Sequence, residues 1–380
     1  MLAMCMSAAL LGACSGNGGR KAAEAEGKMS GDTLLMLVGS YAEADAEGIK
    51  VYEWNQETGE GVYCSGLKGI RNPSFLTVAP DGQHVYSVGE NEEKTSTANA
   101  LLLDPVTKQL SFLGESATDG AAPCNITLSP GRDYVVTANY NGASITVFPV
   151  DEDGTLGEGN VIRFEGKGSD AERQEQPHLH CVYFSPDGKF LLANDLGTDR
   201  IHVFPIDASG EGLLNAAEAF DVQLAPGSGP RHAVFDGSGK HLYVINELKG
   251  DVVMMDYDGV SLRQVQSIQA DTVGAKGSAD IHLSPDGKFL YASNRLQADG
   301  VAVFAVKAED GTLTKVGYQL TGAHPRNFAL TPNGKFVLVA CRDTDEIEIY
   351  ERNAETGLLS DTGRRIQTPK PVVIALIERK

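Results

Sequence analysis

Short apolar segments separated by turn residues recur along the whole chain. The clearest marker is a four-residue turn of the Ser-Pro-Asp-Gly type with a short apolar run on each side, and its last residue is in turn Gly82, Arg132, Gly188, Gly239, Gly287 and Gly334. Successive markers are 50, 56, 51, 48 and 47 residues apart. Because Pro fixes φ and Asp and Gly accept a chain reversal, each marker predicts an antiparallel strand pair.

Two further strands are predicted after each pair. Alternating segments such as 201–204 and 301–304 supply a third strand, and a second turn such as 310–313 leads to a fourth. Four strands in a repeat of about 50 residues are typical of a β-propeller blade. The markers leave over one first strand at 371–376 and three strands within 34–66, which complete each other. We therefore predict an all-β, seven-bladed β-propeller whose last blade is shared between the two termini.

The N-terminal segment has a different character. Residues 1–13 carry no charge, and Leu11-Gly12-Ala13-Cys14 resembles the lipobox of bacterial lipoproteins, although no Lys or Arg precedes the apolar stretch. The resemblance implies a lipoprotein signal peptide at 1–13, acylation of Cys14 and a flexible tether at 14–31, followed by the propeller at 32–380. The expected location is the cell envelope, through a lipid anchor, or the cytoplasm if the signal is not processed.

Charge and cysteine content narrow the possible partners. The chain has 32 Lys and Arg against 51 Asp and Glu, a net charge of −19, which argues against duplex nucleic acid and against an anionic membrane surface. Membrane contact is therefore expected through the lipid anchor alone, and the protein is expected to be a monomer. Cys64, Cys124, Cys181 and Cys341 show no CxxC spacing, so they are interpreted as small buried hydrophobic residues.

Equivalent positions in successive blades form rings around the channel of a propeller, and two of these rings face the same mouth. The first strands are predicted to begin at Ser74, Cys124, His180, Arg231, Ala279, Arg326 and Val372. The second strands are predicted to end at Ser40, Glu90, Tyr140, Leu196, Glu247, Arg295 and Arg342. Four arginines thus converge with His180 and Glu247 on one opening of an acidic protein.

Neither a metal nor a cofactor is predicted at this mouth. Five of the eight histidines lie near the starts of first strands, namely His178, His180, His232, His282 and His324. His178 and His180 could supply two metal ligands, but no third ligand is fixed by the pattern. The sequence contains no GxGxxG, Walker or nucleophile-elbow motif, and no helix is predicted after the Gly-rich loop at 227–230.

Several motifs resemble the seven-bladed lactonase family over residues 33 to 380. They are Gly229-Pro230-Arg231-His232-Ala233-Val234-Phe235, Tyr243-Val244-Ile245-Asn246-Glu247-Leu248, the segment 279–287 and His324-Pro325-Arg326. That family contains bacterial 6-phosphogluconolactonases of the propeller type and fungal carboxy-muconate lactonising enzymes. The resemblance implies a site made of one His, two Arg and one Glu, which fall on His180, Arg231, Glu247 and Arg295, with His178 as an alternative to His180.

The expected function is hydrolysis of a sugar-acid lactone, as in 6-phosphogluconolactonase, with a small anionic lactone or carboxylate as substrate. Glu247 is assigned as the base for water, His180 as the proton shuttle, and Arg231 with Arg295 as anchors for anionic groups and the oxyanion. Further substrate contacts are expected from Arg326, Arg342, His178 and His282. Two alternatives remain open at this point: a lactonising cycloisomerase of the carboxy-muconate type, and a non-catalytic envelope propeller that binds an anionic ligand.

Overall fold

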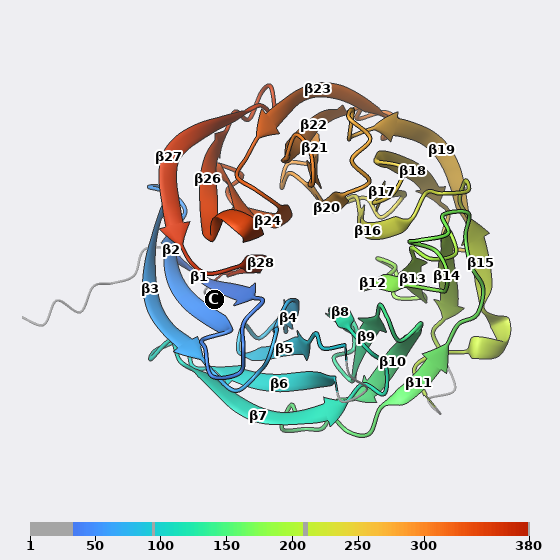
Figure 1. Cartoon of the computed structure of the whole chain (residues 1–380), viewed down its shortest axis with the longest axis horizontal. Coiled ribbons are helices and arrows are strands. Elements are labelled where there is room, and N and C mark those ends of the chain that lie inside the picture. The colour runs from blue at the N-terminus through green and yellow to red at the C-terminus, as the bar shows by residue number, and fades with distance from the viewer. Residues whose placement is uncertain (1–32, 93–95, 208–211, 379–380) are drawn as a thin grey trace, which may run out of the picture. The chain divides into compact units, whose positions relative to one another are not determined.

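Seven four-stranded antiparallel sheets are arranged around a central channel (Figure 1). The structure is a computed structural model that describes residues 33–92, 96–207 and 212–378. Within these ranges the predicted seven-bladed propeller is confirmed. The predicted signal peptide, Cys14 and the tether lie outside the described residues.

Each blade follows the chain from an inner strand to an outer one. Blade 1 consists of β4 (Leu76–Val78), β5 (His84–Gly89), β6 (Thr97–Leu103) and β7 (Leu110–Ala117). Blade 2 consists of β8 (Pro123–Leu128), β9 (Tyr134–Asn139), β10 (Ser144–Pro149) and β11 (Asn160–Arg163). Blade 3 consists of β12 (Leu179–Phe184), β13 (Phe190–Asp195), β14 (Arg200–Pro205) and β15 (Phe220–Gln223). Blade 4 consists of β16 (Pro230–Phe235), β17 (His241–Asn246), β18 (Asp251–Tyr257) and β19 (Leu262–Gln269). Blade 5 consists of β20 (Ser278–Leu283), β21 (Phe289–Asn294), β22 (Gly300–Val306) and β23 (Leu313–Leu320). Blade 6 consists of β24 (Pro325–Leu330), β25 (Phe336–Cys341), β26 (Glu346–Arg352) and β27 (Leu359–Gln367).

Blade 7 joins the two ends of the described chain. Its inner strand is β28 (Pro371–Ile377), which pairs antiparallel with β1 (Thr33–Ser40), and β2 (Ile49–Asn55) and β3 (Glu60–Leu67) complete the sheet. The register runs from Leu35 opposite Ile377 to Gly39 opposite Val373. Figure 1 shows the blue N-terminal strands beside the red C-terminal strand. The predicted shared blade is therefore confirmed.

The repeated turns owe their shape to the residues that mark them. The Ser or Thr hydroxyl at the first position accepts a hydrogen bond from the main chain five residues later, as in Ser185 to Phe190 (3.0 Å) and Thr331 to Phe336 (2.9 Å). The fourth position has a positive φ in every marker, and Arg132 adopts φ 64° where the other repeats have Gly. Only Gly reaches this region without a steric cost, which explains the recurrent Gly in the sequence pattern.

Hydrophobic packing lies between the blades. Each of seven buried clusters draws its side chains from two neighbouring sheets, including the pair formed by blades 6 and 7, where Trp54 packs edge-on against Phe336. Of the four cysteines within the described residues, Cys124, Cys181 and Cys341 are buried, as predicted, whereas Cys64 on the outer strand β3 is only partly covered. The core is therefore a set of interfaces arranged in a ring rather than one central mass.

Polar side chains also tie neighbouring inner strands together. In three places a side-chain oxygen at the third position of one inner strand accepts the main-chain N–H at the fourth position of the next, namely Asn125 from Val182 (3.0 Å), Asp280 from Phe328 (3.3 Å) and Asn327 from Ile374 (2.8 Å). Such a bond fixes the position of one blade against the next, so residues at equivalent positions reach the channel at the same height.

Removal of residues 371–380 is expected to destabilise the propeller strongly. The truncation deletes β28, whose Val372, Val373, Ile374 and Ile377 are all less than 9% exposed. At about 1.5–3 kcal/mol for each buried side chain, the loss is comparable with the whole stability of a typical domain. Thermal unfolding should show a transition lowered by more than about 10 °C or no cooperative transition. Removal of 379–380 alone is the control, and an unchanged transition in the longer truncation would contradict the shared-blade closure.

Candidate active site

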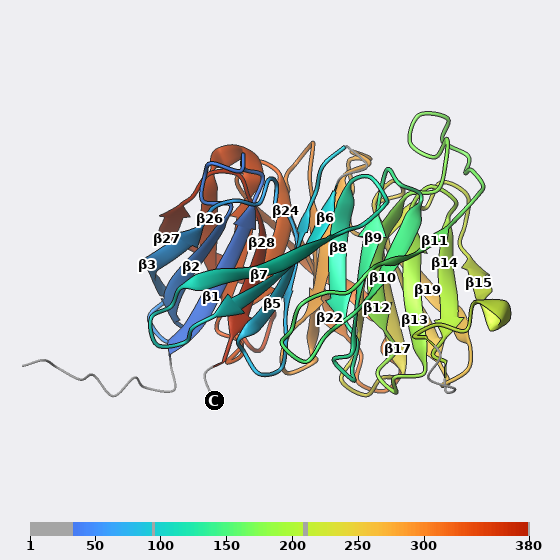
Figure 2. The ribbon, with the colours of Figure 1, turned by 90° about the horizontal axis from the view of Figure 1, so that it is seen from below.

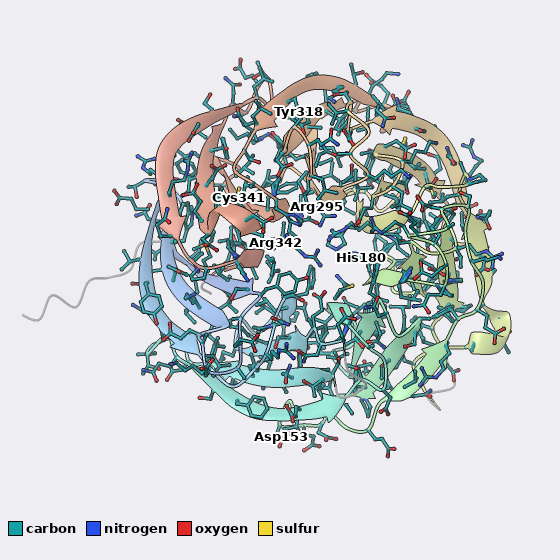
Figure 3. All side chains as sticks on the ribbon, viewed as in Figure 1. Asp153, His180, Arg295, Tyr318, Cys341 and Arg342 are labelled. Atoms are coloured by element: carbon teal, nitrogen blue, oxygen red, sulfur yellow. The ribbon has the colours of Figure 1, made fainter. Side chains whose placement is uncertain are left out.

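A cavity of about 240 Å³ opens at the end of the channel where the inner strands begin and the second strands end. This is the mouth that the sequence pattern predicts. Its lining includes Tyr41, Glu90, Tyr140, Arg173, His180, Glu247 and Arg326. Figure 3 shows His180 and Arg295 directed toward the central channel. The volume lies just below the range of roughly 300–1,000 Å³ common for ligand sites, so it suits a compact, single-ring ligand.

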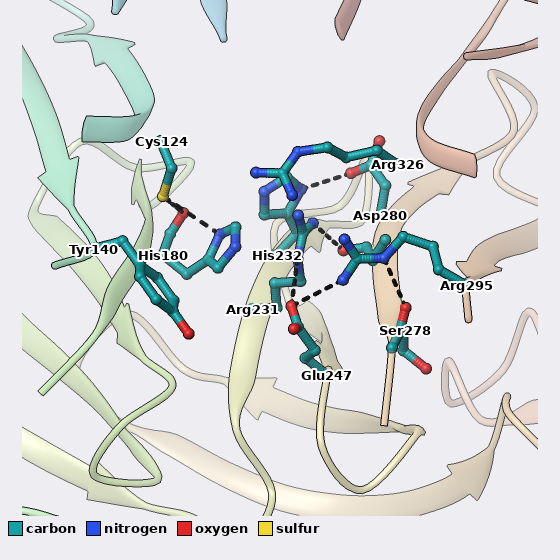
Figure 4. A network of polar contacts seen from close by, with 12 residues as sticks. Cys124, Tyr140, His180, Arg231, His232, Glu247, Ser278, Asp280, Arg295 and Arg326 are labelled. Atoms are coloured by element: carbon teal, nitrogen blue, oxygen red, sulfur yellow. Dashed lines mark hydrogen bonds and ion pairs between the residues drawn. The ribbon is translucent and has the colours of Figure 1, made fainter. Parts of the chain in front are cut away.

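Glu247 is the centre of the charge arrangement at this mouth (Figure 4). It follows β17, and its Oε2 accepts from Arg231 Nε at 2.8 Å and lies 3.1 Å from Arg295 Nη2. Its Oε1 accepts from Arg173 Nη2 at 2.7 Å. Burial alone would raise the pKa of Glu247, but the charges of Arg295, Arg231 and Arg173 outweigh it and lower the pKa to about 2. Glu247 is therefore ionised at neutral pH.

Arg231 and Arg295 are buried and held at several points. Arg231 Nη1 donates to the carbonyl of Ala279 at 2.6 Å, and Arg295 Nε donates to the carbonyl of Gly277 at 2.8 Å. Burial lowers the pKa of Arg295 to about 9, although the charge of Glu247 opposes this, so the side chain is protonated at neutral pH. Both guanidinium groups are thus fixed cations whose positions are set before any ligand enters.

A second polar group lies on the side of blades 1 and 7. Arg326, at the start of β24, lies 3.8 Å from Glu90 Oε2 and stacks over the ring of Tyr41 at 5.4 Å. The Tyr41 hydroxyl donates to Glu90 at 2.9 Å, and Ser74 donates to the same carboxylate. Arg326 therefore belongs to the mouth, as predicted, but its charge is largely matched by Glu90.

His180 presents a neutral imidazole to the cavity. Burial and the charges of Arg231, His232 and Arg326 lower the pKa of His180 well below its usual value. Nδ1 lies 3.7 Å from Cys124 Sγ, and Figure 4 shows the opposite edge of the ring directed away from Cys124. His180 is one of the residues that line the cavity. His180 is therefore a neutral base at pH 7 with one edge available to a ligand.

His178 has a supporting position behind the cavity. Its ring stacks on Tyr140 with centroids 4.3 Å apart, Nδ1 contacts the Tyr140 carbonyl at 3.1 Å, and Nε2 lies 3.3 Å from Glu175. The cavity lining contains His180 and not His178. The structure thus distinguishes two histidines that the sequence left as alternatives.

Of the predicted site residues, His180, Glu247 and Arg326 line the cavity, whereas Arg231 and Arg295 reach it only through Glu247, and His282 and Arg342 neither line it nor pair with Glu247. His282 lies deeper along β20 and faces Asp280 at 2.9 Å, while Asp280 also receives the His232 ring at 2.7 Å. Arg342 begins the short helix η2 (Arg342–Thr344) and pairs with Asp343. Within the described residues no three His, Cys, Asp or Glu side chains are grouped so as to hold a metal ion.

Arg173 is the functional candidate that the sequence pattern did not identify. It comes from residues 164–178, the connection between β11 and β12, and reaches Glu247 from outside the two rings. The signal was present in the spacing, because the interval of 56 residues between Arg132 and Gly188 is the longest of the series. Residues inserted between blades have no fixed register, so their direction cannot be deduced from the repeat.

Comparison with known proteins assigns the chain to a protein family. The family model described as lactonase, 7-bladed beta-propeller, matches residues 35–376. The chain belongs to the seven-bladed β-propeller lactonase family. The family predicted from the sequence motifs is therefore confirmed.

Named relatives cover most of the chain. A 6-phosphogluconolactonase of Formosa agariphila is 35% identical over 85% of this chain and 94% of its own length, and that of Bacillus subtilis is 31% identical over 90% and 98%. A crystal structure of a 6-phosphogluconolactonase homologue from Bacteroides fragilis superposes with a TM-score of 0.87 at 50% identity, covering 91% of this chain and 98% of the other. The periplasmic gluconolactonase of Pseudomonas aeruginosa gives a TM-score of 0.85 at 32% identity, covering 91% and 99%. The expected 6-phosphogluconolactonase-like lactonase is confirmed.

Replacement Glu247→Gln is expected to reduce the free energy of unfolding by about 3–5 kcal/mol at neutral pH, because Arg231 and Arg295 lose their buried counter-charge. Glu ionises near pH 4.5 when unperturbed and near 2 in this fold, so the ionised form stabilises the fold above pH 4.5. That contribution is lost as the pH falls toward 2, and the difference between variant and wild type should narrow there. Urea unfolding of both proteins at several pH values measures this difference in the free energy of unfolding. Equal stability of the two proteins at pH 7 would contradict the assigned ion pairs, and Glu92→Gln at the exposed rim is the control.

Proposed function

We propose that the mouth cavity hydrolyses the lactone of a sugar acid, with water attacking the ring carbonyl. The observation that carries this proposal is the neutral His180 directed into a cavity beside fixed guanidinium groups. Ester hydrolysis needs a base for water and a positive site for the oxyanion, and the cavity offers both. The names of the relatives support the same substrate class, since they are 6-phosphogluconolactonases and a gluconolactonase.

The proposed reaction moves one proton through His180. As water attacks the carbonyl carbon, His180 Nε2 takes a proton from it and the carbonyl oxygen becomes negative. The guanidinium groups of the mouth stabilise that oxyanion. When the ring C–O bond breaks, the imidazolium returns the proton to the leaving ring oxygen, so the product is a hydroxy acid and the histidine is neutral again.

Glu247 has a different role in this proposal from the one expected from the sequence. Both carboxylate oxygens of Glu247 are occupied by guanidinium groups, Oε1 by Arg173 and Oε2 by Arg231 and Arg295, so in this arrangement neither is free to take a proton from water. Its contacts instead hold Arg231 and Arg295 in one arrangement. We therefore assign water activation to His180 and the positioning of the cationic groups to Glu247.

Replacement His180→Asn is expected to lower kcat for lactone hydrolysis by about 10² to 10⁴ with little change in KM, because it removes the base and keeps a similar polar shape. Hydrolysis is followed with gluconolactone and its 6-phosphate, corrected for spontaneous ring opening. His84→Asn, at the turn between β4 and β5, is the matched control and should retain wild-type kinetics. Wild-type kcat in His180→Asn would exclude this assignment.

We also propose that the mature protein begins at an acylated Cys14 and is attached to the cell envelope by lipid. The support is the Leu11-Gly12-Ala13-Cys14 pattern, and the Pseudomonas aeruginosa relative is described as periplasmic.

When the protein is expressed in cells supplied with labelled palmitate, the protein should incorporate the label. The replacement Cys14→Ser should abolish this incorporation because the acyl acceptor is lost. Cys64→Ser, which changes a half-buried cysteine of the propeller, should remain labelled. Unlabelled, soluble wild-type protein in the same cells would exclude the anchor.

A further inference from the structure

Arg173 is carried above the mouth by the longest connection between blades. The connection 164–178 joins the outer strand β11 of blade 2 to the inner strand β12 of blade 3. Figure 2 shows it as the green loop that rises highest on the mouth side. Arg173, on this connection, is one of the residues that line the cavity.

The main chain beside Arg173 is firmly anchored. Gln174 is 1% exposed, and its Nε2 donates to the carbonyl of Leu196 at 2.8 Å and to Asp199 Oδ1 at 2.7 Å. On the other side, Lys276 Nζ donates to Asp170 Oδ2 at 2.8 Å from the connection between β19 and β20. The guanidinium of Arg173 is thus presented to the cavity from a fixed base.

Arg173 differs from the other arginines on Glu247 in its accessibility. Its side chain is 37% exposed, against 1% for Arg231 and 6% for Arg295. Among the described residues its side-chain hydrogen bonds all use Nη2, to Glu247 Oε1 and to the Tyr140 hydroxyl at 3.4 Å. A guanidinium has five N–H donors in a planar fork, so Nε and Nη1 are available for the oxygens of an entering anion.

Arg173 can exchange its contact with Glu247 for another anion without leaving the buried carboxylate unpaired. Arg173 alone occupies Oε1, whereas Arg231 and Arg295 share Oε2. If Arg173 turns to another anion, Glu247 still has two buried cationic partners. Arg326 is less suited to such an exchange, because it lies over Tyr41 and against Glu90.

We propose that Arg173 is the specificity-determining residue of the cavity and binds the phosphate of a phosphorylated sugar-acid lactone, exchanging Glu247 Oε1 for phosphate oxygens. This inference rests on the proposed function and deepens it by naming the residue that recognises the phosphate of the substrate. Bidentate recognition of phosphate by a planar guanidinium supplies the selectivity. The buried Arg231 and Arg295 stay paired with Glu247 Oε2 and are not part of this exchange.

The first test measures binding of the hydrolysis product and needs no turnover. Titration calorimetry with 6-phosphogluconate and with gluconate gives two dissociation constants for each protein. Wild type is expected to prefer the phosphorylated acid, and Arg173→Ala should reduce this preference by about 10- to 150-fold, the range for charged hydrogen bonds. Arg173→Lys keeps the charge without the fork and should lie between the two. Arg200→Ala removes an equally exposed arginine, paired with Asp221 and Gln223 at the mouth-side end of β14, and should keep the preference.

The second test compares kcat/KM for 6-phosphogluconolactone and gluconolactone in the same proteins. Arg173→Ala should lower the ratio of the two constants by the same factor as in the titration. An unchanged preference in Arg173→Ala, or an equal loss of affinity for both acids, would overturn the proposal. A wild type that prefers 6-phosphogluconate, loses this preference in Arg173→Ala and hydrolyses neither lactone would support the role of Arg173 and refute the proposed function. A wild type with no preference for the phosphorylated acid would refute the role of Arg173 whatever its hydrolytic activity.

Discussion

Ring closure by β28 on β1 is the constraint on which the rest of the structure depends. Each blade has one hydrophobic cluster on either side, so every sheet is stable only when both neighbours are present. Pairing of the first and last strands completes the ring with main-chain hydrogen bonds and covers the last two faces. The side-chain bonds between inner strands then set the blades at one height, so seven inner strands begin around a single mouth.

The mouth concentrates positive charge in a chain whose net charge is −19. Burial of guanidinium groups is unfavourable unless their donors are satisfied. Here the inner edges of the blades provide the acceptors, because the carbonyls of Gly277 and Ala279 face the arginines, and Glu247 provides the counter-charge. The cationic groups are therefore fixed in place by the fold itself, which is the arrangement that stabilises a developing oxyanion with little reorganisation.

Two kinds of residue divide the work at this site. His180 is kept neutral by burial and by neighbouring cations, so its imidazole keeps a lone pair at neutral pH. Glu247 is kept ionised by neighbouring cations and holds them together. The cations of the mouth therefore shift both pKa values downward, which leaves the histidine neutral and the glutamate as a counter-ion.

The sequence by itself determined the blade number, the shared blade and the mouth at which His180, Arg231, Glu247, Arg295 and Arg326 meet, because turn chemistry and strand alternation are local and repeat along the chain. It could not separate His178 from His180, since both lie near the start of the same inner strand. It also missed Arg173, which belongs to an insertion without register, and it placed His282 and Arg342 with the site although the cavity lining does not include them. Only the tertiary structure decided these points, because the direction of a side chain at the mouth depends on contacts between blades that are about 50 or more residues apart in the sequence.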